Sequence, residues 1–415
     1  MSRELPSVAI DRERLVDTAS RMIGVHSFTG DEEGMARLMV ELYEARGLHV
    51  QWQQVEDGRA NALGILEGTG GGKSLMLNGH MDTSYSGREP WLADVPGFQP
   101  EPFVRDGRLY GLGISNMKGA LACYVEAVSA LQDAGVKLRG DVLIAAVCGE
   151  IEKAQYGDAV GAQYRGYAAG SRHLVTHGGV ADMCLLGEPT EGKVVLAHFG
   201  TLWLRLRVHG NFVHTAFTEG GRGENSILRM HDVLAAVREW IPTWEDDPAN
   251  AHEGAKAIVN VGAIDGGFGW RVSRTPHHTD LCLDVRVPPR KPMALARREV
   301  LELVRGLAER FPGYGIEGEV YVTAPGAEID EGHELVAAID ASHAEVFGST
   351  PKRDVTRWFS DASALTRYGI PTVNYGTSTG LMDVELGENL ELDGLVRTAE
   401  VYAGVAQRIC GSFPA

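Results

Sequence analysis

The residues best suited to chemistry in this 415-residue chain follow an apolar run that ends at Gly79. His80 and Asp82 come directly after it in the order His-x-Asp. A neutral imidazole binds divalent metals, and a nearby carboxylate can hold the other ring N–H and fix the tautomer. If residues 75–80 form a buried parallel strand, both side chains lie at its carboxyl end, where open α/β sheets bind their ligands. One such histidine is weak evidence, since most loop histidines bind no metal, so the hypothesis depends on further acidic residues.

Two more apolar runs end in acidic side chains. Residues 141–148 lead into Glu150 and Glu152, and residues 180–187 lead into Glu188. The carboxyl ends of neighbouring parallel strands meet at one edge of a sheet, so these side chains are expected to lie near His80. A solvated loop explains any one of the three strand ends, but it explains all three less well.

A glycine-rich loop at residues 107–119 precedes a strongly apolar segment, residues 120–134, that is expected to be a helix. Loops of this kind can cradle phosphate groups. The glycine spacing here matches neither a P-loop nor a dinucleotide-binding fingerprint. The loop therefore gives no support to a nucleotide site.

The elements that must position these residues follow from apolar periodicity. Residues 11–23 predict a helix, and Thr29 with the acidic residues after it predicts the cap of a second helix that ends near residue 45. Two short strands are expected at 50–55 and 60–66, around a turn at Asp57-Gly58.

The pattern changes at about residue 193. The elements then expected are strands at 201–209, 258–264, 280–287 and 317–324, with helices at 226–240 and 293–311. This β-α-β-β-α-β order is typical of a ferredoxin-like unit. Helices at 333–346, 360–369 and 395–409 and a strand at 372–375 return the chain to the first domain. We expect a catalytic domain of residues 1–195 and 325–415 and an inserted domain of residues 196–324.

Composition narrows the class of protein. Apolar residues make up 44% and charged residues 23% of the chain, as in ordinary globular proteins. Lys and Arg number 39 against 56 Asp and Glu, and the net charge of −17 argues against nucleic acid or an anionic membrane as a partner. No signal peptide or membrane-spanning stretch is apparent, and five scattered cysteines suit a reduced compartment. These features favour a cytoplasmic protein.

Taken together, the motifs resemble those of the large amidohydrolase and peptidase family (M20-like) that includes aminoacylase, succinyl-diaminopimelate desuccinylase and glutamate carboxypeptidase. The matching motifs lie at residues 79–82, 111–119, 149–151, 187–190, 210–214 and 369–376. The resemblance implies an α/β fold: a mostly parallel sheet flanked by helices forms the catalytic domain, and the inserted ferredoxin-like α+β domain is a lid and dimerisation domain. It also implies metal-dependent hydrolysis of a C–N bond in a small carboxylated substrate, by a homodimer or a higher oligomer.

The resemblance assigns roles to particular residues. His80 and Glu188 match the two private ligands of one metal, with Asp82 behind His80, and Glu150 matches the general base. Asn116 stands where the family has a carboxylate shared by two metals. His214 matches the lid histidine that reaches the active site of the partner subunit and stabilises the developing oxyanion.

The departures from the family pattern fall on the other metal. Its private ligands are replaced by Ile151 and Val384, and the shared ligand Asn116 has lost its charge. Glu152 is an alternative ligand if the register shifts by two residues. We therefore predict a single, labile divalent transition metal, Mn, Zn or Co, because so few ligands and charges remain.

Two arginines are candidates for holding a substrate carboxylate. Arg286 and Arg274 both lie in the inserted domain, and a planar guanidinium suits a bidentate contact with a carboxylate. Packing within the lid or exposure on its surface is an equally good explanation for either side chain.

Three functions are consistent with the motifs. The leading hypothesis is an amidohydrolase of N-acyl amino acids or similar amides. A second is a hydrolytic deaminase of an activated aromatic amine such as 5-nitroanthranilate, an activity also found in the family, whose mechanism forms no tetrahedral amide intermediate. A third is a metal-free, non-catalytic ligand-binding relative. The retention of Glu150 together with His80 and Glu188 argues against the third.

Overall fold

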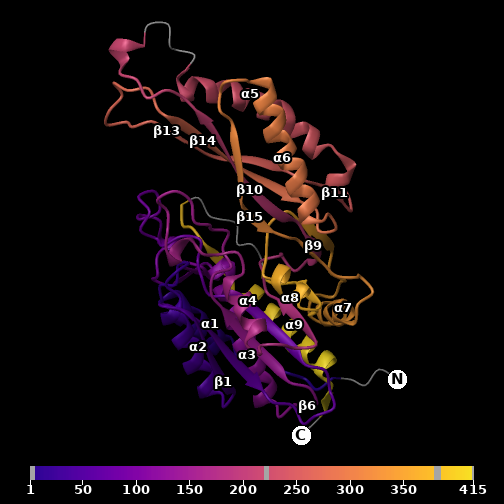
Figure 1. The fold of residues 1–415 in the computed structure, drawn as a ribbon. Coiled ribbons are helices and arrows are strands. Elements are labelled where there is room, and N and C mark those ends of the chain that lie inside the picture. Colours follow the sequence, from indigo (N-terminus) through magenta and orange to yellow (C-terminus); the bar gives the residue numbers. More distant parts are fainter. Residues whose placement is uncertain (1–4, 219–223, 378–384, 414–415) are drawn as a thin grey trace. The chain divides into compact units, whose positions relative to one another are not determined.

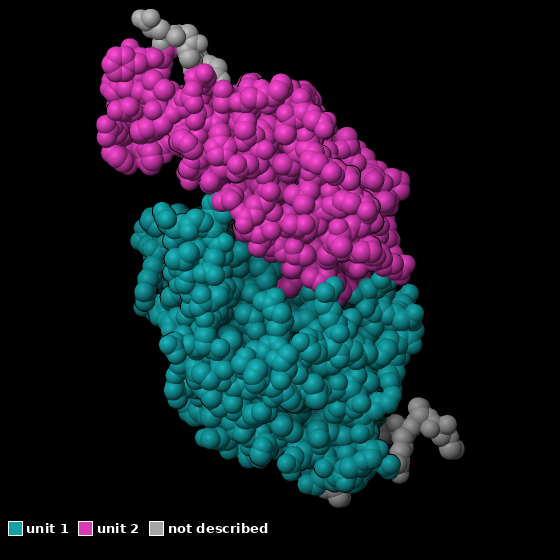
Figure 2. All heavy atoms as spheres, in the orientation of Figure 1, with its two compact units in different colours: residues 1–196, 328–354, 360–415 teal, residues 197–327, 355–359 magenta. Residues whose placement is uncertain are grey.

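The computed structural model describes residues 5–218, 224–377 and 385–413. Two compact units make up the chain, and Figure 2 shows them in different colours. Unit 1 consists of Met1–Leu196, Glu328–Asp354 and Ser360–Ala415. Unit 2 consists of Ala197–Ala327 and Val355–Phe359.

The larger sheet has nine strands and a parallel centre. Its order is β1-β2-β7-β3-β8-β18-β9-β16, with β17 paired to β9. Strands β7, β3, β8 and β18 run parallel, whereas β1 and β2 add antiparallel strands at one side. The bounds are β1 His49–Glu56, β2 Arg59–Leu66, β3 Leu75–His80, β7 Val142–Val147, β8 Met183–Leu186, β9 Val194–His198, β16 Ala327–Glu328, β17 Arg353–Thr356 and β18 Thr372–Asn374. The predicted α/β class is confirmed.

Helices cover both faces of this sheet, as Figure 1 shows. In β3, Leu75 and Leu77 belong to a core shared with five helices, whereas Met76 belongs to a second core with two others. This alternation is the period of two of a strand that is buried on both faces. The first face carries α1 Arg12–Ile23, α2 Glu33–Ala45, α3 Gly119–Asp133, α7 Glu334–Phe347 and α9 Leu392–Cys410, and the second carries α4 Ala169–Thr176 and α8 Ala362–Arg367.

Local sequence explains where these helices start. Asp11 caps α1 by accepting a hydrogen bond from the Arg14 backbone N–H, and the buried residues of α1 recur every three or four positions. The prediction for α2 was wrong in one detail. Its N-cap is Glu32 without a side-chain cap, and Thr29 instead donates a hydrogen bond to Asp82.

The glycine-rich loop is supported by short strands. A three-stranded sheet of order β19-β5-β4 brings together Asn389–Glu391, Arg108–Tyr110 and Phe103–Arg105. The chain then passes through a single helical turn, Ile114–Lys118, directly into α3. The smaller pieces of unit 1 are the turns Pro96–Phe98 and Ala162–Tyr164 and the paired strands β6 Lys137–Leu138 and β20 Ser412–Phe413.

Unit 2 has the predicted ferredoxin-like order. Its strands are β10 Gly200–His209, β13 Val259–Gly266, β14 His278–Val287 and β15 Glu317–Ala324, with helices α5 Ser226–Glu245 and α6 Met293–Arg310. The sheet order is β13-β14-β10-β15, and α5 and α6 lie side by side on one face (Figure 1). Alternate residues of β10 are buried beneath these helices, as expected for a sheet covered on one side. A two-stranded hairpin, β11 Ala251–His252 and β12 Ala255–Lys256, follows α5.

Within the described residues, no helix is both long and apolar enough to span a membrane.

We expect Tyr124→Phe to lower the free energy of unfolding by about 1–2 kcal/mol. The buried Tyr124 hydroxyl on α3 donates a 2.7 Å hydrogen bond to the backbone carbonyl of Asn78 in β3, and its loss leaves that carbonyl poorly paired. Urea denaturation measures the change. Tyr368→Phe is the control, because Tyr368 is exposed and should tolerate the change. Equal stability of the two variants would contradict this role for Tyr124.

Candidate functional site

Three predicted side chains meet at the carboxyl edge of the larger sheet. His80 ends β3, and the two strands that flank β3 in parallel, β7 and β8, lead into Glu150 and Glu188. All three side chains are buried, and one ligand atom from each lies within 4.8 Å of the others. His80 Nε2 is 3.7 Å from Glu188 Oε1 and 3.9 Å from Glu150 Oε2. The register of three strands therefore assembles the site that the sequence predicts.

Asn116 joins this group from a different element. It lies in the turn Ile114–Lys118 before α3, and its Oδ1 is 2.9 Å from His80 Nε2. The amide oxygen thus lies beside the imidazole and adds no charge to the group.

The orientation of the His80 ring is fixed by backbone. Its Nδ1 is 2.8 Å from the carbonyl oxygen of Asp82, which can only accept a hydrogen bond. Nδ1 therefore carries a proton, and Nε2 faces Asn116 Oδ1 and the acidic side chains. We expected the Asp82 carboxylate to hold this N–H, but its Oδ1 lies 3.6 Å from Nδ1 and the main chain makes the contact instead.

The Asp82 carboxylate fixes the neighbouring loops. Its Oδ1 accepts the Glu150 N–H at 3.0 Å, and its Oδ2 accepts the Ile151 N–H at 3.2 Å and the Thr29 hydroxyl at 2.9 Å. Asp82 is fully buried, so these bonds form without competition from water. The carboxylate of Asp82 therefore positions Glu150 through main-chain hydrogen bonds. The carbonyl of the same residue positions the His80 ring.

A buried ion pair between Arg59 and Glu32 supports the loop that carries Glu150. The Arg59 guanidinium is 0% exposed and bonds both oxygens of Glu32 at 2.7 and 2.8 Å. It also donates to the carbonyl of Arg165 at 2.8 Å. Gly149, with φ +68°, passes so close that a Cβ would lie 2.2 Å from Arg59 Nη2. A glycine is therefore required immediately before Glu150.

One buried carboxylate near this cluster was not predicted from the sequence. Asp361 immediately precedes α8, is fully buried, and interacts electrostatically with His80, Glu188 and Asp82. In the sequence, Asp361 is an acidic residue at the start of a helix. No apolar strand directly precedes it, so the sequence does not indicate that it lies at the edge of the sheet.

Burial and mutual repulsion shift the proton affinities in this cluster. Burial, then the charges of Glu188 and Asp361, raise the pKa of Glu150 well above its usual value. Burial also raises the pKa of Glu188, against the attraction of His80, and that of Asp361 to about 7. Burial alone would lower the pKa of His80, but the charges of Glu188, Asp82 and Asp361 raise it. When they are ionised, the carboxylates of this cluster outnumber its one cationic group, the imidazole of His80.

These residues fit a divalent cation. Glu188 Oε1 and both carboxylate oxygens of Asp361 are buried without a hydrogen-bond partner of ordinary geometry in the described part of the chain. Buried charges of this kind are normally paired or bound to a metal. An imidazole nitrogen beside carboxylate oxygens suits transition metals such as Mn, Zn and Co.

Three other positions concern the ligands of the second metal in the family pattern. Ile151 offers only its backbone N–H to Asp82. Glu152 is outside the group of ligand atoms that lie within 4.8 Å of one another. Val384, expected where the family carries its last histidine, lies outside the described residues.

The remaining predicted residues belong to unit 2. His214 caps the short turn Thr215–Phe217, and its Nδ1 accepts the Ala216 N–H at 3.1 Å, which leaves Nε2 as the nitrogen that can donate. Arg274 pairs with His214 through a β-bridge and stacks over Phe212 at 5.3 Å. Arg286 is largely buried and bonded to Asp284 at 2.8 and 3.1 Å.

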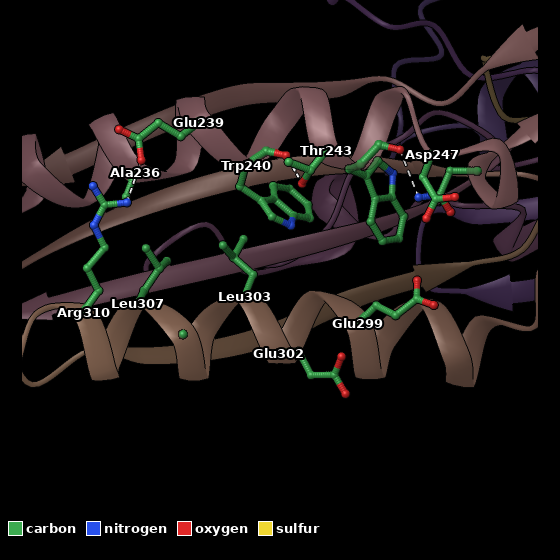
Figure 3. Close-up of a pocket in the computed structure, with 13 residues that line it drawn as sticks. Ala236, Glu239, Trp240, Thr243, Asp247, Glu299, Glu302, Leu303, Leu307 and Arg310 are labelled. Atoms are coloured by element: carbon green, nitrogen blue, oxygen red, sulfur yellow. Dashed lines mark hydrogen bonds and ion pairs between the residues drawn. The ribbon is translucent and has the colours of Figure 1, made fainter.

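Unit 2 also has a surface groove of its own, shown in Figure 3. It lies between α5 and α6, has a volume of about 700 Å³, and is lined by Trp240 and Trp244 together with several acidic residues. None of the candidate site residues contributes to it. The groove therefore contains no residue of the predicted site.

Comparison with known proteins identifies the family. Residues 76–408 match the model of peptidase family M20/M25/M40. Similar proteins include an N-formyl-4-amino-5-aminomethyl-2-methylpyrimidine deformylase of Bacillus subtilis, 25% identical over 94% of this chain and 93% of that one. An acetylornithine deacetylase of Klebsiella pneumoniae is 26% identical over 99% and 100%.

Solved structures agree on the fold. Human carnosine dipeptidase 1 superposes with a TM-score of 0.74 at 14% identity, covering 96% of each chain. An aminopeptidase from Bacillus cereus has a TM-score of 0.73 at 20% identity, covering 96% of this chain and 99% of that one. The chain belongs to peptidase family M20/M25/M40. It is a metal-dependent amidohydrolase that acts on small amide bonds.

We expect Arg59→Leu to lower the free energy of unfolding by about 3–5 kcal/mol, because Glu32 would be left as an unpaired buried charge. Arg37→Leu is the matched control. Arg37 pairs with Glu33 on the surface of α2, and such exposed pairs contribute at most about 0.5 kcal/mol. Chemical denaturation of both variants measures the difference. A loss for Arg59→Leu no larger than that of the control would show that the pair does not hold the loop.

Proposed function

We propose that this protein hydrolyses a C–N bond in a small carboxylated substrate, using one labile divalent transition metal, Mn, Zn or Co. The observation that carries the proposal is the buried group of His80, Glu150 and Glu188 at one sheet edge. In this proposal His80 and Glu188 hold the ion, with the Asn116 amide beside them.

The ligand count supports a single ion. Two-metal hydrolases share a carboxylate between ions about 3.5–4 Å apart. Here the shared position is the neutral Asn116, and Ile151 supplies only an alkyl side chain. A second divalent ion would lack both the charge and the ligands that hold it.

Glu150 is proposed as the general base. A bound ion would polarise the substrate and lower the pKa of a water molecule. A nearby positive charge also favours the ionised form of Glu150, whose pKa is high without it. Its carboxylate can then take a proton from the attacking water and deliver it to the leaving nitrogen. The hydrogen bonds from the Glu150 and Ile151 N–H groups to Asp82 keep this carboxylate in place.

The residues of unit 2 complete the proposal. Residues 196–324 are proposed to be a lid and dimerisation domain, with residues 1–195 and 325–415 as the catalytic domain. His214 Nε2 would donate a hydrogen bond to the developing oxyanion in the active site of the partner subunit, and Arg286 or Arg274 would hold the substrate carboxylate. The Arg286 guanidinium is already oriented by Asp284, which favours a fixed contact.

The named relatives support one substrate class in particular. A deformylase, a deacetylase and a succinyl-diaminopimelate desuccinylase are all described as removing an acyl group. An N-acyl amino acid or a related amide is therefore our first candidate. Hydrolytic deamination of an activated aromatic amine is the second, because the neutral Asn116 and aliphatic Ile151 leave a reduced site that suits a reaction without a tetrahedral amide intermediate.

A homodimer through unit 2 is proposed from its sheet edge. Strand β13 lies at the end of the four-stranded order, and all of its residues after Val259 are exposed. Ile264 is 58% and Val261 38% exposed on this edge. An exposed strand edge with apolar side chains readily pairs with a second chain.

The base assignment is tested with Glu150→Gln. This substitution should reduce kcat by about 10²–10⁴-fold because the amide cannot accept the proton of water. Elemental analysis after loading should still find one bound ion per chain, whereas His80→Ala and Glu188→Ala should lose it. N-acyl amino acids and nitroanthranilates are assayed in parallel with Mn²⁺, Zn²⁺ or Co²⁺ added. Two tightly held ions in the unmodified protein, or normal turnover by Glu150→Gln, would contradict the proposal.

The dimer is tested with Ile264→Asp. A charge on the β13 edge should prevent strand pairing and shift the protein toward the 44.8 kDa monomer in size-exclusion chromatography with light scattering. Val180→Asp is the control, because Val180 is a 58% exposed apolar residue in unit 1. Dissociation of both variants, or of neither, would argue against β13 as the interface.

A further inference from the structure

Asp361 is a buried carboxylate whose role the proposed reaction leaves open. It lies between Ser360 and α8, and its side chain is 0% exposed. Its backbone carbonyl accepts the N–H groups of Ala364 and Leu365, so the main chain is fixed at this point. The side chain is therefore held inside the protein and cannot reach solvent by a local rotation of the backbone.

Three other buried carboxylates in unit 1 have explicit partners. Asp82 accepts three hydrogen bonds, Glu32 is paired with Arg59, and Glu126 is paired with Arg14. Asp361 differs: the Ser171 hydroxyl favours its ionised form, but among the described residues it forms no ion pair and neither of its oxygens has a hydrogen bond of ordinary geometry. Burying an unpaired charge is costly, so such a side chain indicates a ligand that neutralises it.

The electrostatic neighbours of Asp361 are the members of the metal site. His80 attracts its charge, and Glu188, Asp82 and Glu150 repel it. The cationic side chains nearby are Arg172, which interacts with Asp361, and Lys153, which interacts with Asp82. Neither forms an ion pair with these carboxylates in the described structure, and the Arg172 guanidinium donates instead to the carbonyl of Gly166 at 3.4 Å.

A cation would balance the negative charge that this cluster carries when its carboxylates are ionised. Four buried carboxylates, Asp82, Glu150, Glu188 and Asp361, surround one imidazole. Asp361 is not in the group whose ligand atoms lie within 4.8 Å of one another. A carboxylate in this position adds attraction for an ion without occupying one of the inner ligand positions.

We propose that Asp361 is part of the cation site: an outer carboxylate whose charge holds the single divalent ion and offsets the charge absent at Asn116 and Ile151. This inference rests on the proposed metal site. It explains how an ion with only two protein ligands of the family pattern is retained in this chain. It also assigns a functional role to the start of α8.

The test measures Mn²⁺ binding to the apo-protein by isothermal titration calorimetry, together with unfolding of the apo-protein in urea. Asp361→Asn should raise the dissociation constant of Mn²⁺ by about tenfold or more, the usual effect of removing a supporting group of a metal site. The same variant should unfold at the same or a higher urea concentration than the unmodified apo-protein, because an unpaired buried charge has been removed. Asp361→Ser, which also removes the charge but is smaller, should show the same loss of affinity.

Glu126→Gln is the matched control. Glu126 is a buried carboxylate of α3 that already has its cation, Arg14, so this variant should lose stability and keep its Mn²⁺ affinity. Unchanged affinity in both Asp361 variants would overturn the inference. Weaker binding accompanied by a loss of apo-protein stability like that of the control would also overturn it, since it would show a structural role. An unmodified protein that binds no Mn²⁺ would instead contradict the proposed function itself.

Discussion

The site depends on the parallel pairing of β3 with β7 and β8. In this arrangement the carboxyl ends of the strands reach the same edge, so His80, Glu150 and Glu188 converge although they are far apart in sequence. The strands are buried on both faces and make continuous backbone hydrogen bonds, which leaves little freedom for their ends to move. A rigid sheet therefore sets the distances between the reacting groups.

Electrostatic repulsion is the cost of this arrangement. Bringing several carboxylates together inside the protein disfavours their ionised forms, and the high pKa of Glu150 and Glu188 shows the effect. The fold compensates with main-chain donors to Asp82 and with the buried pair of Arg59 and Glu32, which hold the loops against this repulsion. A divalent ion would relieve what remains, so metal binding and the order of the site are physically linked.

The departures from the family pattern fall on the proposed ligands of one metal only. In the proposed site His80 and Glu188, which would serve one metal, lie close together, while Asn116 and Ile151 stand at the positions proposed for the ligands of another. Asn116 still lies against His80, so the shape of the site is kept while its charge is reduced. A site with less charge holds its ion less tightly and leaves more coordination positions open to substrate.

Much of this protein is determined by local sequence. Apolar periodicity gave the helices and strands of both units, including the ferredoxin-like order, because each buried face repeats with the period of its element. The ordered motifs also placed His80, Glu150 and Glu188 at strand ends. What only the tertiary structure decided are the contacts between segments distant in sequence. These are the hydrogen bond of Thr29 to Asp82, the burial of Arg59 behind Gly149 and the electrostatic interaction of Asp361 with His80 and Glu188. None of them has a local signal, because a single acidic or basic residue in a loop looks the same whether it is solvated or buried. Its role is set by the charges that packing brings next to it.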